Sequence, residues 1–176
     1  GKTLICADYS QIELRIMAHM SGDPKLVEAY QNGADIHRLT ASQIFDVDFD
    51  DVTADQRRAG KTINFGVMYG MGSRRLARDL NISTKEAKTY IENYFERYQG
   101  VSAFFEQLKS RAREVGYAET LFGRRRILSE INGYGRQRAF AERVAVNMPI
   151  QGTAADIIKV AMLRIQERID ESEVLL

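Results

Sequence analysis

Four residues in the segment RRAGKTINFGVMYG (57–70) are spaced so that their side chains can act together. Arg57, Lys61, Phe65 and Tyr69 follow one another at intervals of four. On a helix each interval turns the side chain by only about 40°, so all four share one broad stripe. A stripe packed in a core would not carry two cations, and a fully solvated stripe would not carry two aromatic rings. The pattern predicts binding of an anionic ligand with a flat face, such as a nucleotide.

A second group of candidate residues lies near the start of the chain. The apolar run TLICADYS predicts a buried strand with the carboxylate of Asp8 at its C-terminal end. The backbone amides of Ser10 and Gln11 would then lie at the N-terminus of the next helix, where a phosphate is favoured. Mg²⁺ prefers oxygen ligands and often takes one or two carboxylates together with substrate phosphates. Asp8 is therefore a candidate metal ligand.

The elements that would position these residues are mostly helices. Capping residues, apolar spacing and breakers predict helices over residues 11–22, 24–32, from 53 through the stripe, 83–99, 101–115, 136–148 and 152–169. Pro149 is expected to end one helix, residues 46–52 to form a loop, and residues 116–128 to form a β-hairpin. Gly60 and Gly66 weaken the stripe helix by about 1 kcal/mol each, which favours close approach or movement there. The expected fold class is α+β and predominantly α-helical.

Length and composition exclude several classes of protein. The 176 residues suffice for one domain or for a fragment of something larger. No stretch approaches the roughly 20 apolar residues of a membrane span, and we expect no secretory leader. The single cysteine, Cys6, excludes an internal disulfide and a cysteine-cluster zinc site. We expect a monomer in the cytoplasm, without a membrane partner.

Charge is distributed unevenly along the chain. Residues 1–56 hold 4 Lys and Arg against 10 Asp and Glu, a net charge of −6. Residues 57–143 hold 18 against 9, a net charge of +9, and residues 144–176 hold 3 against 5, a net charge of −2. Solvated helix faces alone can produce such a pattern. A basic middle also suits a polyanionic partner.

Three segments in this order resemble shared segments of family A DNA polymerases, of the kind found in bacterial DNA polymerase I. The segment DYSQIELR is similar to their motif A, and RRAGKTINFGVMYG matches their motif B pattern, R-x-x-x-K-x-x-x-F-x-x-x-Y-G. The segment NMPIQGTAADI resembles a third shared segment. The resemblance covers essentially the whole chain. It implies a right-hand polymerase fold, in which fingers close over the incoming nucleotide and the palm holds two Mg²⁺ ions.

The resemblance implies roles in metal and triphosphate binding. Asp8 matches the first metal-binding aspartate, assisted by the backbone carbonyl of Tyr9. Arg57 and Lys61 match residues that grip the triphosphate, and Lys61 is also placed to donate a proton to the leaving pyrophosphate. The implied reaction is in-line attack of a primer 3′-hydroxyl on the α-phosphate of a dNTP, with metal ions stabilising the attacking and leaving oxygens.

Further residues are implied in recognition of the sugar, the base and the DNA. Phe65 matches the residue stacked near sugar and base, and Tyr69 the residue beside the templating pair. Glu13 matches the steric gate that, with Tyr69, excludes a ribose 2′-hydroxyl, and His37 matches a histidine near the phosphates. The residues implied to contact primer-template DNA, again four apart, are Arg143, Asn147 and Gln151. The runs Arg74-Arg75 and Arg124-Arg125-Arg126 are either nonspecific phosphate contacts or surface charge.

The same resemblance divides the chain and leaves parts of a polymerase unaccounted for. It assigns residues 1–20 to the palm with motif A, 21–140 to the fingers, and 141–176 to a palm segment that stops before the His-Asp-Glu motif. That motif supplies the second metal-binding aspartate, and EVLL at 173–176 is expected to start its strand. We expect a fragment that is inactive alone. Three alternatives stay open: a noncatalytic nucleic-acid-binding module, a fragment of a single-subunit RNA polymerase, and a purely structural helical domain.

Overall fold

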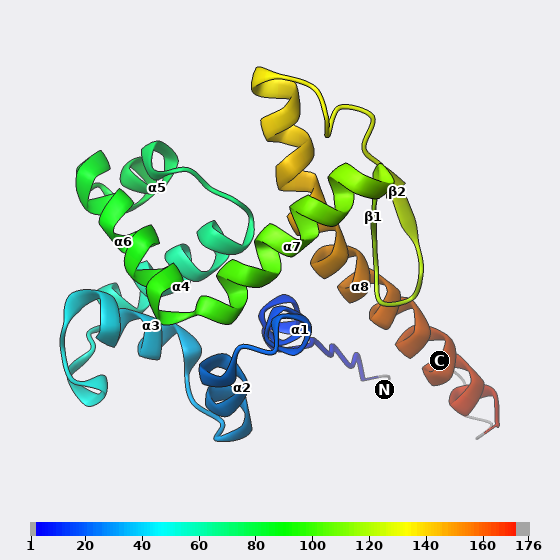
Figure 1. Cartoon of the computed structure of the whole chain (residues 1–176). Helices are drawn as coiled ribbons and strands as arrows, with labels where there is room; N and C mark the ends of the chain where they lie inside the picture. The colour runs from blue at the N-terminus through cyan, green and yellow to red at the C-terminus, as the bar shows by residue number, and fades with distance from the viewer. Residues whose placement is uncertain (1–2, 172–176) are drawn as a thin grey trace.

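The structure, a computed structural model, describes residues 3–171 and within them is mostly helical (Figure 1). In chain order the elements are α1 (Ile12–Ser21), α2 (Pro24–Gln31), α3 (Ile36–Phe45), the 3₁₀ turn η1 (Phe49–Asp51), α4 (Ala54–Met68), α5 (Ser73–Leu80), α6 (Thr84–Arg97), α7 (Gln99–Val115), β1 (Tyr117–Glu119), β2 (Arg125–Ile127) and α8 (Gly135–Glu171). None of the helices described is long and apolar enough to cross a membrane.

Capping side chains set the start of several helices, as the sequence predicts. At α4 the backbone N–H of Gln56 donates to the Thr53 hydroxyl at 3.2 Å, and the Gln56 side chain accepts from the Thr53 N–H at 2.9 Å. Ser83 and Glu86 make the same reciprocal pair at α6. Each box satisfies two backbone donors that a helix start otherwise leaves unpaired. Both predicted capping boxes are confirmed.

Helix packing places α1 at the centre of the molecule. Helices α3, α4, α5 and α6 gather on one side, α7, α8 and the hairpin on the other, and α1 lies between them (Figure 1). Leu14 and Met17 of α1 are buried in one core with Ile63 of α4 and Ile150 of α8. A smaller core joins α7, the hairpin and the first half of α8. The apolar face of α1 therefore fixes α4 and α8 relative to each other.

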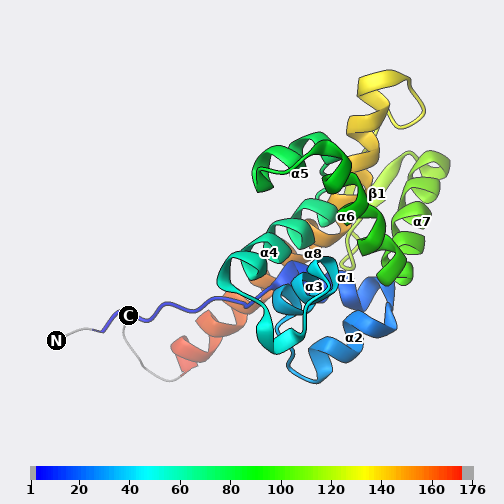
Figure 2. The same cartoon turned by 90° about the vertical axis from the view of Figure 1, so that its left-hand side faces the viewer.

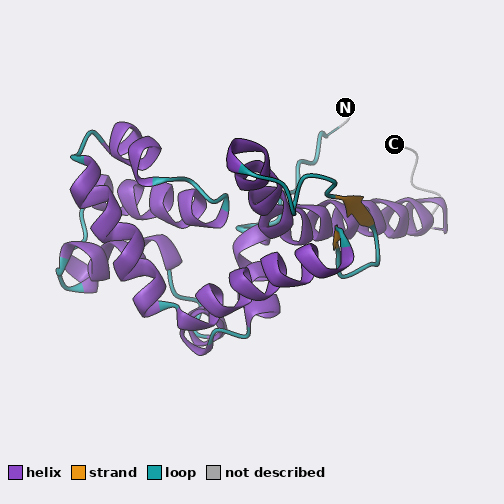
Figure 3. Ribbon diagram, turned by 45° about the horizontal axis from the view of Figure 1, so that its top comes forward, coloured by secondary structure: helices purple, strands orange, loops and turns teal. Residues whose placement is uncertain are grey.

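The predicted hairpin forms and packs on α8. Strands β1 and β2 pair antiparallel, with Tyr117 opposite Ile127 and Glu119 opposite Arg125. Gly123 turns the chain between the strands with a φ of 80°, a conformation that suits glycine. The view coloured by secondary structure shows this short sheet against a molecule otherwise built of helices (Figure 3).

Two predicted elements are wrong. Residues 3–9 form no strand, and Leu4 and Ile5 are 95% and 86% exposed, because no described strand pairs with them and no apolar surface covers them. This segment and the C-terminal end of α8 project from the same side of the molecule (Figure 2). Pro149 does not end a helix, because α8 runs through it. Buried Met148 and Ile150 hold both halves of α8 against the cores, which outweighs one lost backbone hydrogen bond. The predicted strand at 173–176 lies outside the described residues.

Candidate nucleotide and nucleic-acid site

The four predicted stripe residues lie along α4 and its C-cap. Tyr69 is the C-cap residue, and its ring stacks on Phe65 with centroids 6.0 Å apart and planes 22° apart. The ring of His37, from α3, lies 5.8 Å from that of Phe65. Lys61 is exposed one turn earlier. The cations thus occupy the N-terminal part of the stripe and a row of rings occupies the rest.

Arg57 has a partner that the sequence reasoning did not identify. Its Nε donates to Oδ2 of Asp35 at 2.6 Å. Asp35 precedes α3 and is 22 residues away in sequence, so no local pattern relates the two residues. Helices α3 and α4 lie side by side in two views, and their packing brings the pair together (Figures 1 and 2).

His37 is buried and held in one orientation. Its Nδ1 lies 3.1 Å from Nδ2 of Asn64, whose Oδ1 accepts from the Thr40 hydroxyl at 3.0 Å. Because the amide nitrogen of Asn64 can only donate, Nδ1 is the acceptor and the neutral ring carries its proton on Nε2. Burial lowers the pKa of His37, and the positive charges of Arg57 and Lys61 lower it further, whereas Asp35 raises it. His37 is therefore a neutral hydrogen-bond donor at pH 7.

Tyr69 joins the three segments that resemble polymerase motifs. Its hydroxyl donates to Oε2 of Glu13 on α1, and its backbone oxygen accepts from Nδ2 of Asn147 on α8 at 3.4 Å. Burial and the bond to Glu13 raise the pKa of Tyr69 to about 12, while a hydrogen bond with Gln151 lowers it. Glu13, Tyr69, Asn147 and Gln151 thus meet at one point, although Glu13 and Asn147 lie 56 and 78 positions from Tyr69 in sequence.

A basic hollow of about 670 Å³ adjoins this junction. It lies between the hairpin and α8, and its polar lining includes Arg125, Arg126, Arg143, Asn147 and Gln151. All three residues predicted to contact DNA therefore line one hollow. Next to it, Gly70 leaves room for Arg143, since a Cβ at Gly70 would lie 3.1 Å from Cγ of Arg143. The hollow has the charge and the polar edges that suit a phosphate backbone and a minor groove.

Arg124 has a structural role that distinguishes it from its two neighbours. Its Nε donates to Oδ1 of Asp156 and its Nη2 to the backbone oxygen of Gly152, both at 2.9 Å. Oδ2 of the buried Asp156 accepts from the Thr120 hydroxyl at 2.8 Å. These bonds clamp the hairpin to α8 beside Gln151. Arg124 is thus not a free surface charge, although it also lines the basic hollow.

The predicted metal and phosphate residues at the start of the chain are not assembled into a site. Asp8 and Tyr9 are exposed, in a groove shared with apolar residues of α8. Ser10 is exposed, and its backbone oxygen accepts from Nε of Arg15. Gln11 is the N-cap of α1 with a φ of 56°, and its Oε1 accepts from the Tyr30 hydroxyl. The described part of the chain contains no cluster of three acidic, histidine or cysteine ligands. The described residues can therefore supply one carboxylate ligand to a metal centre, but they do not form a complete centre.

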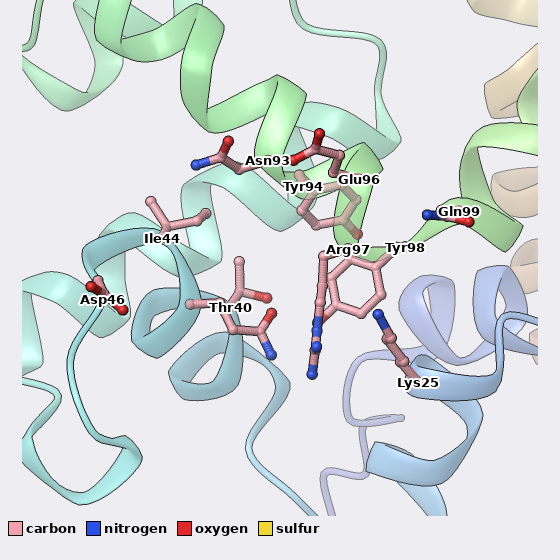
Figure 4. A pocket seen from close by; sticks show the side chains of 11 residues that line it. Lys25, Thr40, Ile44, Asp46, Asn93, Tyr94, Glu96, Arg97, Tyr98 and Gln99 are labelled. Carbon is pink, nitrogen blue, oxygen red and sulfur yellow. The ribbon is translucent and has the colours of Figure 1, made fainter.

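A second hollow, of about 720 Å³, is lined by α2, α3, α6 and the start of α7 (Figure 4). Lys25 and Arg97 line it together with Asp46 and Glu96, so cations and carboxylates balance. The hydroxyl oxygen of Tyr94 has no hydrogen-bond partner in residues 3–171, but this atom is buried and is not exposed to solvent in the hollow. None of the predicted site residues lines this hollow, which therefore lies apart from the candidate site.

Comparisons with known proteins show the family of this chain. The family model described as DNA polymerase family A matches residues 1–176. The chain is 50% identical over 173 residues to DNA polymerase I of Pseudomonas aeruginosa, covering 98% of the chain and 19% of that protein. It is 52% identical over 171 residues to DNA polymerase I of Deinococcus radiodurans, covering 97% of the chain and 18% of that protein. The chain thus spans about a fifth of the length of these curated relatives.

A solved structure shows the same fold. It is the POL domain of Pol1 from M. smegmatis, in complex with DNA primer-template and dNTP. The two structures superpose with a TM-score of 0.89 at 47% sequence identity, over 94% of this chain and 30% of the other. This likeness confirms the predicted polymerase fold.

Proposed function

The chain belongs to DNA polymerase family A, and we propose that it supplies the nucleotide-binding fingers and part of the palm of a template-directed DNA polymerase. The reaction is transfer of a nucleotide from a dNTP to the 3′-hydroxyl of a primer, in DNA replication and repair. The observation that carries the proposal is the junction at Tyr69, where the α4 stripe meets Glu13 and the α8 residues Asn147 and Gln151. We also propose that residues 1–20 and 141–176 belong to the palm and residues 21–140 to the fingers.

The dNTP is proposed to lie along α4 with its triphosphate toward α3. Arg57 and Lys61 bind the phosphates, and His37 donates from Nε2 on the same side. Lys61 is also the proposed proton donor to the leaving pyrophosphate. The backbone amides of Ser10 and Gln11 are proposed as further phosphate contacts when the palm is complete.

Sugar and base are proposed to lie at the aromatic end of the stripe. Phe65 stacks near the sugar and base, and Tyr69 lies beside the templating pair. The bond from Tyr69 fixes the carboxylate of Glu13, so that it occupies the space of a ribose 2′-hydroxyl. A fixed carboxylate excludes a hydroxyl because both would need the same space.

Primer-template DNA is proposed to occupy the basic hollow beside α8. Arg143 contacts a phosphate, and Asn147 and Gln151 contact sugar or base edges near the last pair. For Mg²⁺ we propose only that Asp8, with the Tyr9 carbonyl, supplies ligands to a centre completed by a carboxylate outside the 176 residues. When bound, the metal ions would stabilise charge on the reacting phosphate.

The proposal is tested by primer extension with the full-length parent protein, using dNTPs and rNTPs separately. The wild type should extend with dNTPs only. Glu13→Ala should raise rNTP incorporation relative to dNTP by at least about tenfold, equal to roughly 1.4 kcal/mol of lost discrimination. Glu28→Ala, which removes an exposed carboxylate from α2, is the matched control and should leave the ratio unchanged. Absence of templated extension by the wild type would overturn the proposal.

A further inference from the structure

Asp35 uses its two carboxylate oxygens for two different tasks. Oδ1 accepts from the backbone N–H groups of His37 and Arg38, at 3.0 and 3.1 Å, and so caps α3. Oδ2 accepts from Nε of Arg57 on α4 at 2.6 Å. One side chain therefore connects the first turn of α3, which carries His37, to the arginine at the start of the stripe.

The way in which Asp35 holds Arg57 leaves the guanidinium fork open. The contact is made through Nε alone, and within residues 3–171 neither Nη atom of Arg57 has a hydrogen-bond partner. The Arg57 side chain is 43% exposed, so the two Nη groups can be reached from outside. An arginine binds phosphate most strongly through paired N–H groups, and fixing Nε sets the plane in which the Nη pair lies.

Arg124 is a useful comparison, because its guanidinium is held by two groups of the protein. It uses Nε on Asp156 and Nη2 on a backbone oxygen at the same time. In both arginines the carboxylate accepts from Nε, but in Arg124 the backbone oxygen of Gly152 also occupies Nη2. Asp35 takes only the nitrogen of Arg57 that a phosphate bound to the two Nη groups does not need.

Charge around Asp35 is consistent with a carboxylate that stays ionised while it holds the arginine. Burial alone would raise the pKa of Asp35, but the hydrogen bond from Arg57 and the two backbone amides hold it below its usual value. The groups that face it are Arg57 from α4 and the backbone N–H groups of His37 and Arg38 from α3. The pair therefore persists throughout the neutral pH range.

We propose that Asp35 is a positioning residue that orients the Arg57 guanidinium toward the triphosphate of the incoming nucleotide. The inference deepens the proposed function and depends on it. Asp35 does not touch the nucleotide itself. It acts through Arg57, and it sets His37 on the same side by capping α3.

The test compares Asp35→Asn and Asp35→Ser in the full-length parent protein. Asn and Ser both cap helices well, so α3 keeps its start. Neither can also hold Arg57 as Asp35 does, because the single remaining acceptor oxygen is used by the cap. We expect the KM for dNTP to rise about fivefold to tenfold with kcat changed less than about twofold, and the inhibition constant of inorganic tripolyphosphate to rise by a similar factor. Asp55→Asn, which breaks an exposed pair with Arg58 on the same helix, should change neither constant.

A second arm separates positioning from a general structural effect. In an Arg57→Ala background, Asp35→Asn should have no further effect on the KM, because the residue it orients is gone. Equal effects in both backgrounds, an unchanged KM, or a lower KM in Asp35→Asn would overturn the inference. A wild type that extends primers normally in those experiments would leave the proposed polymerase function in place, whereas a wild type without activity would overturn that function.

Discussion

Close contact between α3 and α4 at Gly60 leads to a stability prediction with its own internal control. A Cβ on Gly60 would lie 2.3 Å from the backbone oxygen of His37 and 3.1 Å from the Cβ of Ala41. Backbone cannot swing aside as a side chain can, so Gly60→Ala must push the two helices apart. Gly66, on the same helix, differs, because a Cβ there would meet only the flexible side chain of Met71, at 3.3 Å from its sulfur.

The expected cost of Gly60→Ala follows from three contributions. Overpacking costs about 1–3 kcal/mol, here toward the upper end because backbone is involved. Loosening the buried hydrogen bonds between Asn64 and α3 adds about 1 kcal/mol, and the better helix propensity of alanine returns about 1 kcal/mol. We expect the free energy of unfolding to fall by about 2–3 kcal/mol, and Gly66→Ala to leave it unchanged or raise it by up to about 1 kcal/mol.

Urea unfolding of the 176-residue chain, followed by helical circular dichroism, measures both variants against the wild type. In thermal unfolding, 2 kcal/mol corresponds to roughly 4–8 °C for a chain of this size. If Gly60→Ala proves as stable as Gly66→Ala, the close approach of α3 and α4 is not what the structure indicates.

Four further predictions concern the site and its supports. Phe65→Tyr in the parent protein should raise the incorporation of dideoxynucleotides relative to deoxynucleotides, because the new hydroxyl can replace the hydrogen bond of a missing 3′-OH; an unchanged ratio would refute the stacking role. Arg124→Ala should lower the free energy of unfolding by about 2 kcal/mol, because it leaves buried Asp156 without its cation. Arg126→Ala should leave the free energy of unfolding unchanged and should make DNA binding less dependent on salt. Hydrogen bonds from Arg113 and Arg138 hold the pKa of Glu142 below its usual value, so Glu142 stabilises the fold at neutral pH and loses this contribution as pH falls through its lowered folded pKa. Glu142→Gln should therefore flatten the acid side of the stability profile, and a profile equal to that of the wild type would argue against these ion pairs. The 176 residues alone should bind DNA weakly, with affinity falling steeply between about 50 and 200 mM salt, and should not extend a primer; templated extension would show that the second metal ligand lies within them.

Features encoded locally were predictable from the sequence. The two capping boxes, the start of α2 at Asp23 and Pro24, and the shared stripe of α4 depend on residues within a few positions of each other. Helix α3 was missed, although Asp35 caps it, because its sequence carries no second capping residue and ends without glycine or proline. Helix α5 was missed because it is short and rich in arginine. Only two of its residues are buried, so its sequence carries little apolar periodicity.

Features set by tertiary packing were not predictable. The ionic pair of Asp35 with Arg57, the bond of Tyr69 to Glu13, and the clamp of Arg124 on Asp156 join residues 22, 56 and 32 positions apart. The resemblance to family A polymerases indicated that Glu13 and Tyr69 act together, but the chain's own pattern did not. Pro149 was misjudged for the same reason, since its local effect on a helix is outweighed by contacts that α8 makes elsewhere.

The most direct test of the α4 stripe compares two adjacent arginines. Arg57 lies on the stripe, and Arg58 points to solvent, where it pairs with the exposed Asp55. In primer extension by the parent protein, Arg57→Ala should raise the KM for dNTP by at least about tenfold, or roughly 1.4 kcal/mol, and Arg58→Ala should leave it within about twofold of the wild type. Equal KM values for the two variants would contradict the assignment of this face of α4 to the nucleotide.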